Sequence, residues 1–374
     1  MSLKVGIVGL PNVGKSTLFN ALLKKRVALS ANYPFATVEP NVGVVAVPDE
    51  RLNKLADLVA EVSKKPPVVP AVVEFVDIAG LVKGASTGAG LGNQFLSHIR
   101  EVDAIIHVLR DFQDENVVRA GAENPDSDKL VVETELGLAD LQTLEKLIAA
   151  PSFAKASAGK QEMDPLASQK AEILNQIKEE LNQGRNLGKY QIADDRLQDW
   201  FDRLPLLTIK PTLYVLNVSE SAISEHLGGE KNAVTSPRWN GQNEMVISAK
   251  LEEELADYSE EERLEYLRTL GIDQTGLERL IVKAYDLLGL ISFLTAGPKE
   301  VRAWTIKRGT KAPQAAGVIH SDFEKNFIRA QVISYDKLIE AGSYTEAKAK
   351  GWVRTEGKDY EVKDGDVVEF LVSN

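Results

Sequence analysis

Gly9-Leu10-Pro11-Asn12-Val13-Gly14-Lys15-Ser16 is the stretch that decides the fold of this chain. It follows a short apolar segment, residues 5–8, and leads into a helical segment, residues 17–23. In this context the pattern G-x-x-x-x-G-K-S predicts a phosphate-binding P-loop. Its glycines let backbone N–H groups point at a β-phosphate, and the start of the helix adds partial positive charge. Lys15 can reach the β- and γ-phosphates, and the Ser16 hydroxyl can ligate Mg²⁺.

The composition narrows the class of protein. A length of 374 residues suggests two or three domains, and 44 Lys and Arg against 55 Asp and Glu give a net charge of −11. This balance argues against a surface that clamps nucleic acid throughout, but it leaves room for a local basic face. The lack of cysteine excludes disulfides, Cys-ligated zinc, iron–sulfur clusters and thiol nucleophiles. Because the apolar runs are short and the N-terminus has no secretory layout, we expect a cytoplasmic protein without membrane contact.

A second motif lies where a nucleotide hydrolase needs an acidic residue. The apolar segment 72–77 is typical of a strand and ends in Asp77, and Gly80 completes a D-x-x-G pattern. We expect Asp77 to hold Mg²⁺ through water and the Gly80 N–H to contact the γ-phosphate. Thr37, in a polar loop bounded by prolines, is the candidate that completes the Mg²⁺ shell; the alternative is an ordinary loop threonine. Leu81 cannot polarise water, so the nucleophile must be positioned by other means.

Two features beside this motif are less specific. Residues 84–92 contain four glycines, and we expect them to form a mobile extension of switch II, with a plain surface loop as the alternative. His98 lies close to this segment, and His107 lies in an apolar strand. For both histidines we favour a structural role over a catalytic one.

Several segments together resemble one known family, the Obg-like ATPases of the YchF subfamily of translation-factor-related P-loop GTPases. They are GLPNVGKSTLFNAL from Gly9, NYPFATVEPN from Asn32, DIAGLVKGAS from Asp77, GLGNQFLSHIREVDAI from Gly90, TAGPKEVRAWTI from Thr295 and APQAAGVIHSDFEKNFIRAQ from Ala312. The last two resemble a TGS domain, a small β-grasp module. The resemblance covers nearly the whole chain, and it implies that Leu81 is the family's hydrophobic replacement for the catalytic glutamine.

The base-recognition segment indicates which nucleotide is bound. GTPases usually read guanine with N-K-x-D, whereas the strand 211–216 is followed here by Asn217-Val218-Ser219-Glu220. The extra methylene of glutamate should weaken the bidentate contact with guanine, while Asn217 can still bond a purine edge. The resemblance implies a preference for ATP over GTP. Ser248-Ala249-Lys250 matches the loop that supports the base through main-chain groups.

The predicted site residues form three groups. The catalytic candidates are Lys15 and Gly80, and the metal candidates are Ser16, Thr37 and Asp77. The nucleotide-binding candidates are Asn12, Val13, Gly14, Lys15, Ser16, Thr17, Asn217, Val218, Glu220, Ser248 and Ala249.

Asn12 raises the question of a second cation. Some related enzymes that lack the catalytic glutamine carry an asparagine here that helps to hold K⁺, which can take the place of an arginine finger. The alternative, that Asn12 merely fits the loop, is equally favoured. Relatives often carry a histidine within the segment 114–119, but this chain has none there, so no histidine role is transferred. Ala36 stands where many relatives have a cysteine.

The predicted fold class is α/β. A P-loop G domain, residues 1–128 and 205–290, is interrupted by an antiparallel helical hairpin at 129–204 and followed by a TGS-like β-grasp domain at 291–374. Leucines near heptad spacing and a small-residue, charged turn at 154–164 indicate the hairpin. A covering helix pair and a projecting arm that contacts a partner are equally favoured for it. The acidic segment 252–265 is predicted to be a solvated helical face.

Charge is shared unevenly along the chain. Residues 299–374 carry 13 Lys and Arg against 12 Asp and Glu, so the acidic excess belongs to the rest. Basic residues in the first half of this module are interleaved with aromatic ones: Arg302, Lys307, Arg308, Lys311, Lys325 and Arg329, with Trp304 and Phe327. This combination suits RNA contact, although a small β-grasp sheet would also carry such residues as ordinary surface and core. Resemblance to TGS domains favours a ribosomal partner, with the large subunit expected.

The main functional hypothesis is a ribosome-associated, Mg²⁺-dependent hydrolase that cleaves ATP, and GTP less well, with the nucleotide state acting as a switch. Hydrolysis would be water attack on the γ-phosphate, aided chiefly by positioning and charge neutralisation. One alternative is a conventional GTP-preferring switch. The other is a ribosome or stress binding module in which hydrolysis is incidental.

Overall fold

The computed structural model describes residues 3–27, 41–60, 65–80, 90–114, 119, 124–149, 165–227, 243–272 and 274–373. The chain forms two compact units, one of residues 1–22, 39–43 and 75–276, the other of residues 23–38, 44–74 and 277–374. Residues 44–74 therefore group with the C-terminal part of the chain, although their place in the sequence suggests the G domain. The predicted domain boundaries stay a proposal. No helix in the described ranges is long and apolar enough to cross a bilayer.

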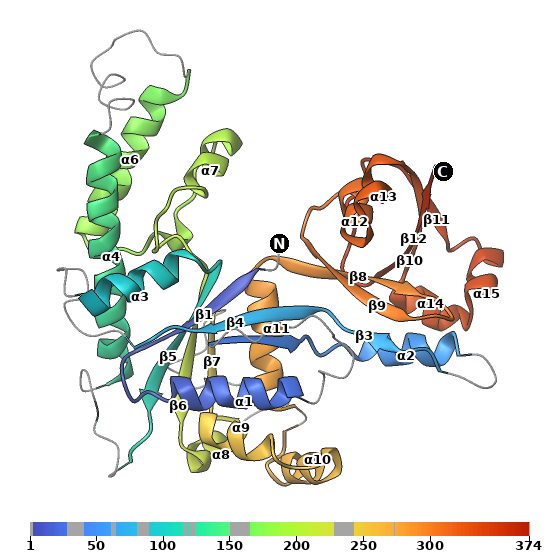
Figure 1. Ribbon diagram of the computed structural model, residues 1–374, viewed down its shortest axis with the longest axis horizontal. Helices are drawn as coiled ribbons and strands as arrows, with labels where there is room; N and C mark the ends of the chain where they lie inside the picture. Colours follow the sequence, from blue (N-terminus) through green and yellow to red (C-terminus); the bar gives the residue numbers. More distant parts are fainter. Residues whose placement is uncertain are drawn as a thin grey trace. The chain divides into compact units, whose positions relative to one another are not determined.

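One sheet has six strands in the order β2-β4-β1-β5-β6-β7. These strands are β1 (Lys4–Val8), β2 (Val42–Ala46), β4 (Val72–Asp77), β5 (Ala104–Asp111), β6 (Thr212–Val218) and β7 (Glu244–Ile247). The pairs β1–β5, β5–β6 and β6–β7 are parallel, as their almost continuous apolar runs require. Figure 1 shows α1 (Lys15–Val27) and α3 (Gly90–Arg100) on opposite sides of this sheet. The α/β fold class is confirmed, and the carboxyl ends of these strands form the edge where ligands bind.

A helical hairpin interrupts this unit between β5 and β6. Its arms α4 (Pro125–Ala149) and α6 (Ala167–Asn182) lie side by side in Figure 1 and share a buried apolar cluster that includes Leu144 and Leu174. The turn at 154–164 lies outside the described residues. Asp140 of α4 is fully buried and accepts hydrogen bonds from the backbone N–H groups of Leu207 and Thr208 and from the Thr208 hydroxyl. This carboxylate attaches the hairpin to the chain that returns to the sheet.

Short helices follow the hairpin and the later strands. They are η3 (Leu187–Lys189), α7 (Asp195–Phe201), α8 (Glu220–Leu227), α9 (Ala249–Leu255), α10 (Glu260–Thr269) and α11 (Gly276–Leu287). A capping box begins α10, in which Ser259 and Glu262 bond each other's backbone N–H groups.

The second sheet has the order β11-β10-β12-β8-β9-β3. Its strands are β3 (Val68–Val69), β8 (Leu290–Ala296), β9 (Val301–Lys307), β10 (Phe327–Ser334), β11 (Arg354–Glu356) and β12 (Asp366–Val372). The helices of this unit are α2 (Glu50–Leu58), α12 (Ala312–Ile319), α13 (Ser321–Lys325), α14 (Tyr335–Ala341) and α15 (Tyr344–Ala349). Ala315 and Ala316 of α12 pack on Phe293, Val332 and Val368. This is the β-grasp arrangement, to which the two-residue strand β3 adds an edge parallel to β9.

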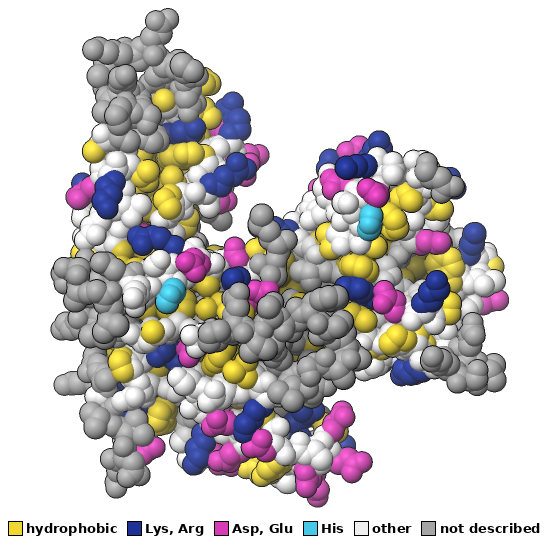
Figure 2. Space-filling model, in the orientation of Figure 1, with side chains coloured by type: hydrophobic (Ala, Val, Ile, Leu, Met, Phe, Trp, Pro, Cys, Tyr) yellow, Lys and Arg dark blue, Asp and Glu magenta, His cyan; other side chains and the backbone are white. Residues whose placement is uncertain are grey.

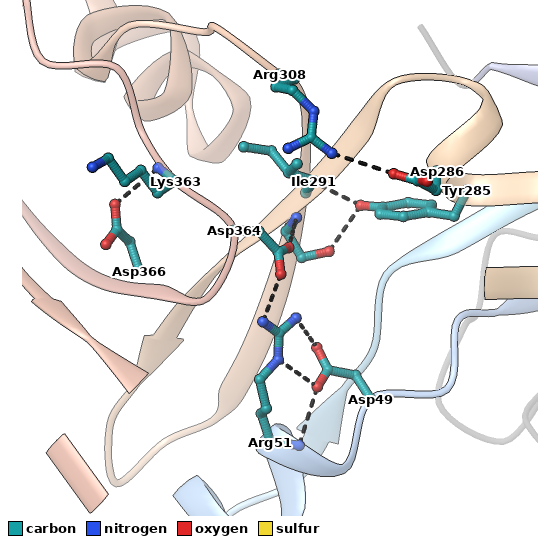
Figure 3. A network of polar contacts seen from close by, with 10 residues as sticks. Asp49, Arg51, Tyr285, Asp286, Ile291, Arg308, Lys363, Asp364 and Asp366 are labelled. Atoms are coloured by element: carbon teal, nitrogen blue, oxygen red, sulfur yellow. Dashed lines mark hydrogen bonds and ion pairs between the residues drawn. The ribbon is translucent and has the colours of Figure 1, made fainter. Parts of the chain in front are cut away.

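Polar contacts attach α2 to the C-terminal sheet (Figure 3). Asp49 caps α2 and accepts from the guanidinium of Arg51, which also donates to Asp364 at 2.8 Å. Asp364 in turn accepts from the backbone N–H of Ser292 on β8 at 2.9 Å. Gly365 has a φ of 77°, and a Cβ at this position would lie 2.7 Å from Nη1 of Arg51. Glycine is therefore favoured here by its left-handed backbone, and an added Cβ would also have to displace the end of the Arg51 side chain.

Candidate nucleotide-binding site

The predicted P-loop connects β1 to α1, at the carboxyl edge of the parallel sheet. Asn12 adopts a left-handed conformation with φ 62°, and Gly14 has φ 96°. A Cβ at position 14 would lie 2.2 Å from Nδ2 of Asn217, so only glycine fits beneath this amide. The loop conformation thus depends on a residue more than 200 positions later in the chain.

Lys15, Asp77 and Gly80 converge at this loop. Lys15 is 8% exposed, and its ammonium donates to the Leu10 carbonyl at 3.4 Å. Burial lowers the pKa of Lys15, and the Asp77 carboxylate opposes this shift. Burial likewise raises the pKa of Asp77, and Lys15 opposes that shift. A Cβ at Gly80 would lie 3.1 Å from Nζ of Lys15, so the D-x-x-G glycine presents bare backbone to the lysine.

The residues present fit a magnesium ion held mainly by phosphate and water. Oδ1 of Asp77 is buried and has no hydrogen-bond partner in the described part of the chain. Ser16, the second residue of α1, is exposed. No cluster of three or more His, Cys, Asp or Glu that could hold a metal occurs among the residues described. Mg²⁺ commonly binds through one or two protein groups and substrate phosphates, so such a cluster is not needed.

Asn217 ties the P-loop to the base-recognition loop. Its Nδ2 donates to the Val13 carbonyl at 2.9 Å, and its Oδ1 accepts from the Ala249 N–H at 2.9 Å. Because one amide N–H and the oxygen are used in this way, one N–H remains for a purine. Ser248 is buried and caps α9 through the Leu251 N–H. The structure therefore brings both predicted base-recognition segments together at the P-loop.

Glu220 has a partner that the sequence analysis missed. It is the first residue of α8, and Oε1 of its carboxylate accepts a hydrogen bond from the hydroxyl of Tyr266 on α10. This bond, with burial as a smaller cause, raises the pKa of Tyr266 to about 12. No spacing rule connects positions 220 and 266. Figure 2 shows acidic side chains gathered over α10, as predicted for the segment 252–265.

Comparison with known proteins assigns the family. Residues 290–373 match the YchF-GTPase_C model, described as a protein of unknown function (DUF933), and residues 4–135 match MMR_HSR1, a 50S ribosome-binding GTPase model. The Ribosome-binding ATPase YchF of Bacillus subtilis (strain 168) is 48% identical over 373 residues, which is 99% of each chain. The protein of that name from Escherichia coli O157:H7 is 47% identical, again over 99% of each. This chain belongs to the YchF family. The Schizosaccharomyces pombe YchF GTPase structure is similar at a TM-score of 0.83, with 36% identity and 99% and 98% coverage.

Arg110 is a second residue of this YchF chain that the sequence analysis did not single out. It lies in β5 and is 4% exposed. Its guanidinium donates to the carbonyls of Asn12 at 3.4 Å and Phe112 at 3.2 Å, and packs over the Phe112 ring. Arg110 therefore supports the P-loop at the residue with the left-handed backbone. In the sequence, the only sign of this role was that Arg110 comes directly after a run of apolar residues.

Other predictions for the YchF chain have mixed outcomes. His107 is buried in β5 beside the Tyr214 ring, which confirms its structural position. The prediction for residues 84–92 is wrong at its end, because α3 already begins at Gly90. The acidic segment is not wholly solvated, since Glu252 is buried and accepts from the Gly276 N–H at 2.7 Å. Thr37, Leu81 and the rest of the glycine-rich run lie outside the described residues.

Proposed function

We propose that this chain is a Mg²⁺-dependent hydrolase that cleaves ATP to ADP and phosphate, and GTP less well. The observation that carries the proposal is the convergence of Lys15, Asp77 and Gly80 at the P-loop. A lysine, an aspartate and a backbone N–H are the kinds of group that hydrolysis of a γ-phosphate uses. The names of the relatives, which are ribosome-binding ATPases, support the same activity.

Each catalytic group has a distinct part in this proposal. The Lys15 ammonium neutralises charge on the β- and γ-phosphates, and the Gly80 N–H contacts the γ-phosphate. Ser16 and Thr37 would hold Mg²⁺ through their hydroxyls, and Asp77 would do so through water. The metal, when bound, supplies further neutralisation of phosphate charge. Leu81 cannot orient the attacking water, so intrinsic hydrolysis is expected to be slow.

The remaining nucleotide-binding residues form the walls of the site. Backbone N–H groups of Asn12, Val13 and Gly14, with Ser16 and Thr17 at the helix start, are proposed to bind the phosphates. The amide of Asn217, with Val218, Glu220, Ser248 and Ala249, is proposed to surround the base. K⁺ bound near Asn12 is a further proposal, and its support is the resemblance to enzymes that lack the catalytic glutamine. The left-handed backbone of Asn12 is equally expected if this residue merely fits the loop.

We also propose that the nucleotide state controls ribosome binding in the cytoplasm, with the large subunit as partner. Support comes from the names of the relatives and from the C-terminal unit, where the Arg302 guanidinium lies 4.1 Å from the Trp304 ring centroid. Arg308 and Lys311 already form ion pairs, with Asp286 and Asp359. Lys307, Lys325 and Arg329 are exposed, so they are better candidates for RNA contact.

Two measurements test the proposal. Competition between ATP and GTP for the full chain should favour ATP, and equal or tighter GTP binding would instead identify a conventional GTPase switch. Lys15→Ala should abolish turnover, and an unchanged rate would contradict the site.

Ribosome co-sedimentation with ATP, with ADP and without nucleotide tests the switch. We expect binding to differ among the three states. Identical binding would favour a binding module in which hydrolysis is incidental. Equal rates in Na⁺ and K⁺ would exclude the role of K⁺.

A further inference from the structure

The bond between Tyr266 and Glu220 occupies one oxygen of the carboxylate that stands at the base-recognition motif. Within the described ranges, no other hydrogen bond reaches this carboxylate. Tyr266 is itself fixed, because its ring packs edge-on against Tyr258 with centroids 6.1 Å apart and an interplanar angle of 84°. The ring contact therefore helps to position the phenol whose hydroxyl donates to Oε1 of Glu220.

The neighbouring amide leaves Glu220 as the adjustable group. Asn217 is buried and bonded on both sides, to Val13 and to Ala249, so the end of β6 is fixed. Glu220 follows three residues later, is exposed, and has a flexible side chain. Its partner therefore affects how well each carboxylate oxygen can accept a hydrogen bond from a base.

Purine edges differ in how many donors they offer. Guanine presents N1–H and the N2 amine side by side, which together match both oxygens of one carboxylate. Adenine presents a single donor group, the N6 amine, beside the acceptor N1. Each carboxylate oxygen can accept two hydrogen bonds, so the phenol does not exclude a base from Oε1, but it weakens this oxygen as an acceptor for a second donor. The amine of adenine can use the other oxygen alone, whereas the two donors of guanine need both oxygens and therefore meet the weakened one.

We propose that Tyr266 is a specificity-determining residue, which disfavours guanine because its hydroxyl bonds Oε1 of Glu220 and so weakens this oxygen as an acceptor for the second donor of guanine. This inference rests on the proposed function, in which Glu220 faces the base and ATP is preferred. Tyr266 acts through Glu220 and touches neither phosphate nor metal.

The test measures the dissociation constants of Mg-ATP and Mg-GTP for the full chain and for Tyr266→Phe. Losing the phenol frees Oε1, so the ratio of the GTP constant to the ATP constant should fall about tenfold, in line with a hydrogen bond to a charged group. General damage to the site would weaken both nucleotides alike and leave the ratio unchanged. Tyr258→Phe is the matched control, since it alters the same aromatic pair without touching Glu220, and its ratio should equal that of the wild type.

A double-mutant comparison separates action through Glu220 from any other route. In a Glu220→Ala background, Tyr266→Phe should leave the ratio unchanged. A shift of equal size in both backgrounds would overturn the inference, as would an unchanged ratio in Tyr266→Phe alone. If the wild type binds GTP as tightly as ATP, the proposed preference for ATP is wrong, and the role of Tyr266 falls with it. If it prefers ATP and the variant keeps the same ratio, only the role of Tyr266 fails.

Discussion

The guanidinium of Arg51 donates to the carboxylate of Asp364 at 2.8 Å, across 313 residues of chain. Arg51 lies in the segment that joins predicted switch I to Asp77 of switch II, and residues 44–74 of that segment share a compact unit with the C-terminal sheet. The backbone contributes to the same attachment, because β3 pairs with β9 and the Val301 N–H donates to the Pro67 carbonyl at 3.0 Å. The segment between the two switches is thus attached to the module for which we propose ribosome contact.

Arg51→Ala should destabilise this unit by about 1–3 kcal/mol, because it leaves the carboxylates of Asp49 and Asp364 without their shared donor. Side-chain exposures of 28% for Arg51 and 10% for Asp49 place this pair well away from full solvent. Urea unfolding measures the change. Lys311→Ala is the control, since its ion pair with Asp359 is exposed to solvent and should contribute little to stability. An equal loss of unfolding free energy in the two variants would show that Arg51 contributes no more than an exposed ion pair.

Gly14→Ala should weaken ATP binding by at least about tenfold, because a Cβ there would meet Nδ2 of Asn217 at 2.2 Å and the backbone is left-handed. Gly184→Ala is the control for a left-handed glycine outside the nucleotide site. Gly184 has a φ of 74° but nothing within 4 Å of the added Cβ, so that variant should lose about 1 kcal/mol of stability and keep its affinity. Titration with Mg-ATP measures the nucleotide affinity of both variants. Similar affinities for the two variants would show that Asn217 does not fix the loop.

Asp77→Asn should weaken the affinity for Mg²⁺ in nucleotide binding by about 10- to 100-fold. This range is typical of groups that hold a metal without ligating it directly. The buried Oδ1 has no hydrogen-bond partner among the residues described, but the substitution also removes the charge that opposes the lowered pKa of Lys15. Nucleotide titration across a Mg²⁺ series, and in EDTA, separates the two effects. Affinity in EDTA should fall much less than affinity in Mg²⁺. A matching loss in EDTA would indicate a structural role instead.

The unfolding free energy should fall as pH falls below about 6.5, partly through His107. Burial, with a smaller effect of Lys129, lowers the pKa of His107 to about 3 from 6.5. Between these values the unfolded chain binds a proton that the folded chain does not, so folding is penalised as pH falls. In His107→Phe the loss of stability between pH 7 and pH 5 should be about 2 kcal/mol smaller.

Urea unfolding at the two pH values tests this prediction. His98→Phe is the control, because His98 is exposed, and its pH dependence should match the wild type. An unchanged pH dependence in His107→Phe would show that another group dominates acid sensitivity.

Local chemistry allowed much of the site to be predicted. The P-loop needs glycines, a lysine and a hydroxyl at fixed spacing between a strand and a helix, and all of these are adjacent in sequence. The same holds for Asp77 and Gly80, which end a recognisable apolar strand. The α/β fold and the helical hairpin followed from the periodicity of apolar residues, because strands and helices repeat over short distances.

Only the tertiary structure decided which distant residues support that site. Tyr266 reaches Glu220, and Arg110 reaches Asn12, through packing of separate elements, and no sequence spacing encodes such contacts. The strand β3 has only two residues, which is too short to show the alternation of apolar and polar residues that identifies a strand. Its place in the sheet depends on pairing with the edge of β9. The sequence alone determined the phosphate chemistry, since that depends on neighbouring residues. The folded chain decided which distant groups contact the proposed base-recognition segments and how residues 44–74 are attached, since both depend on groups brought together only by folding.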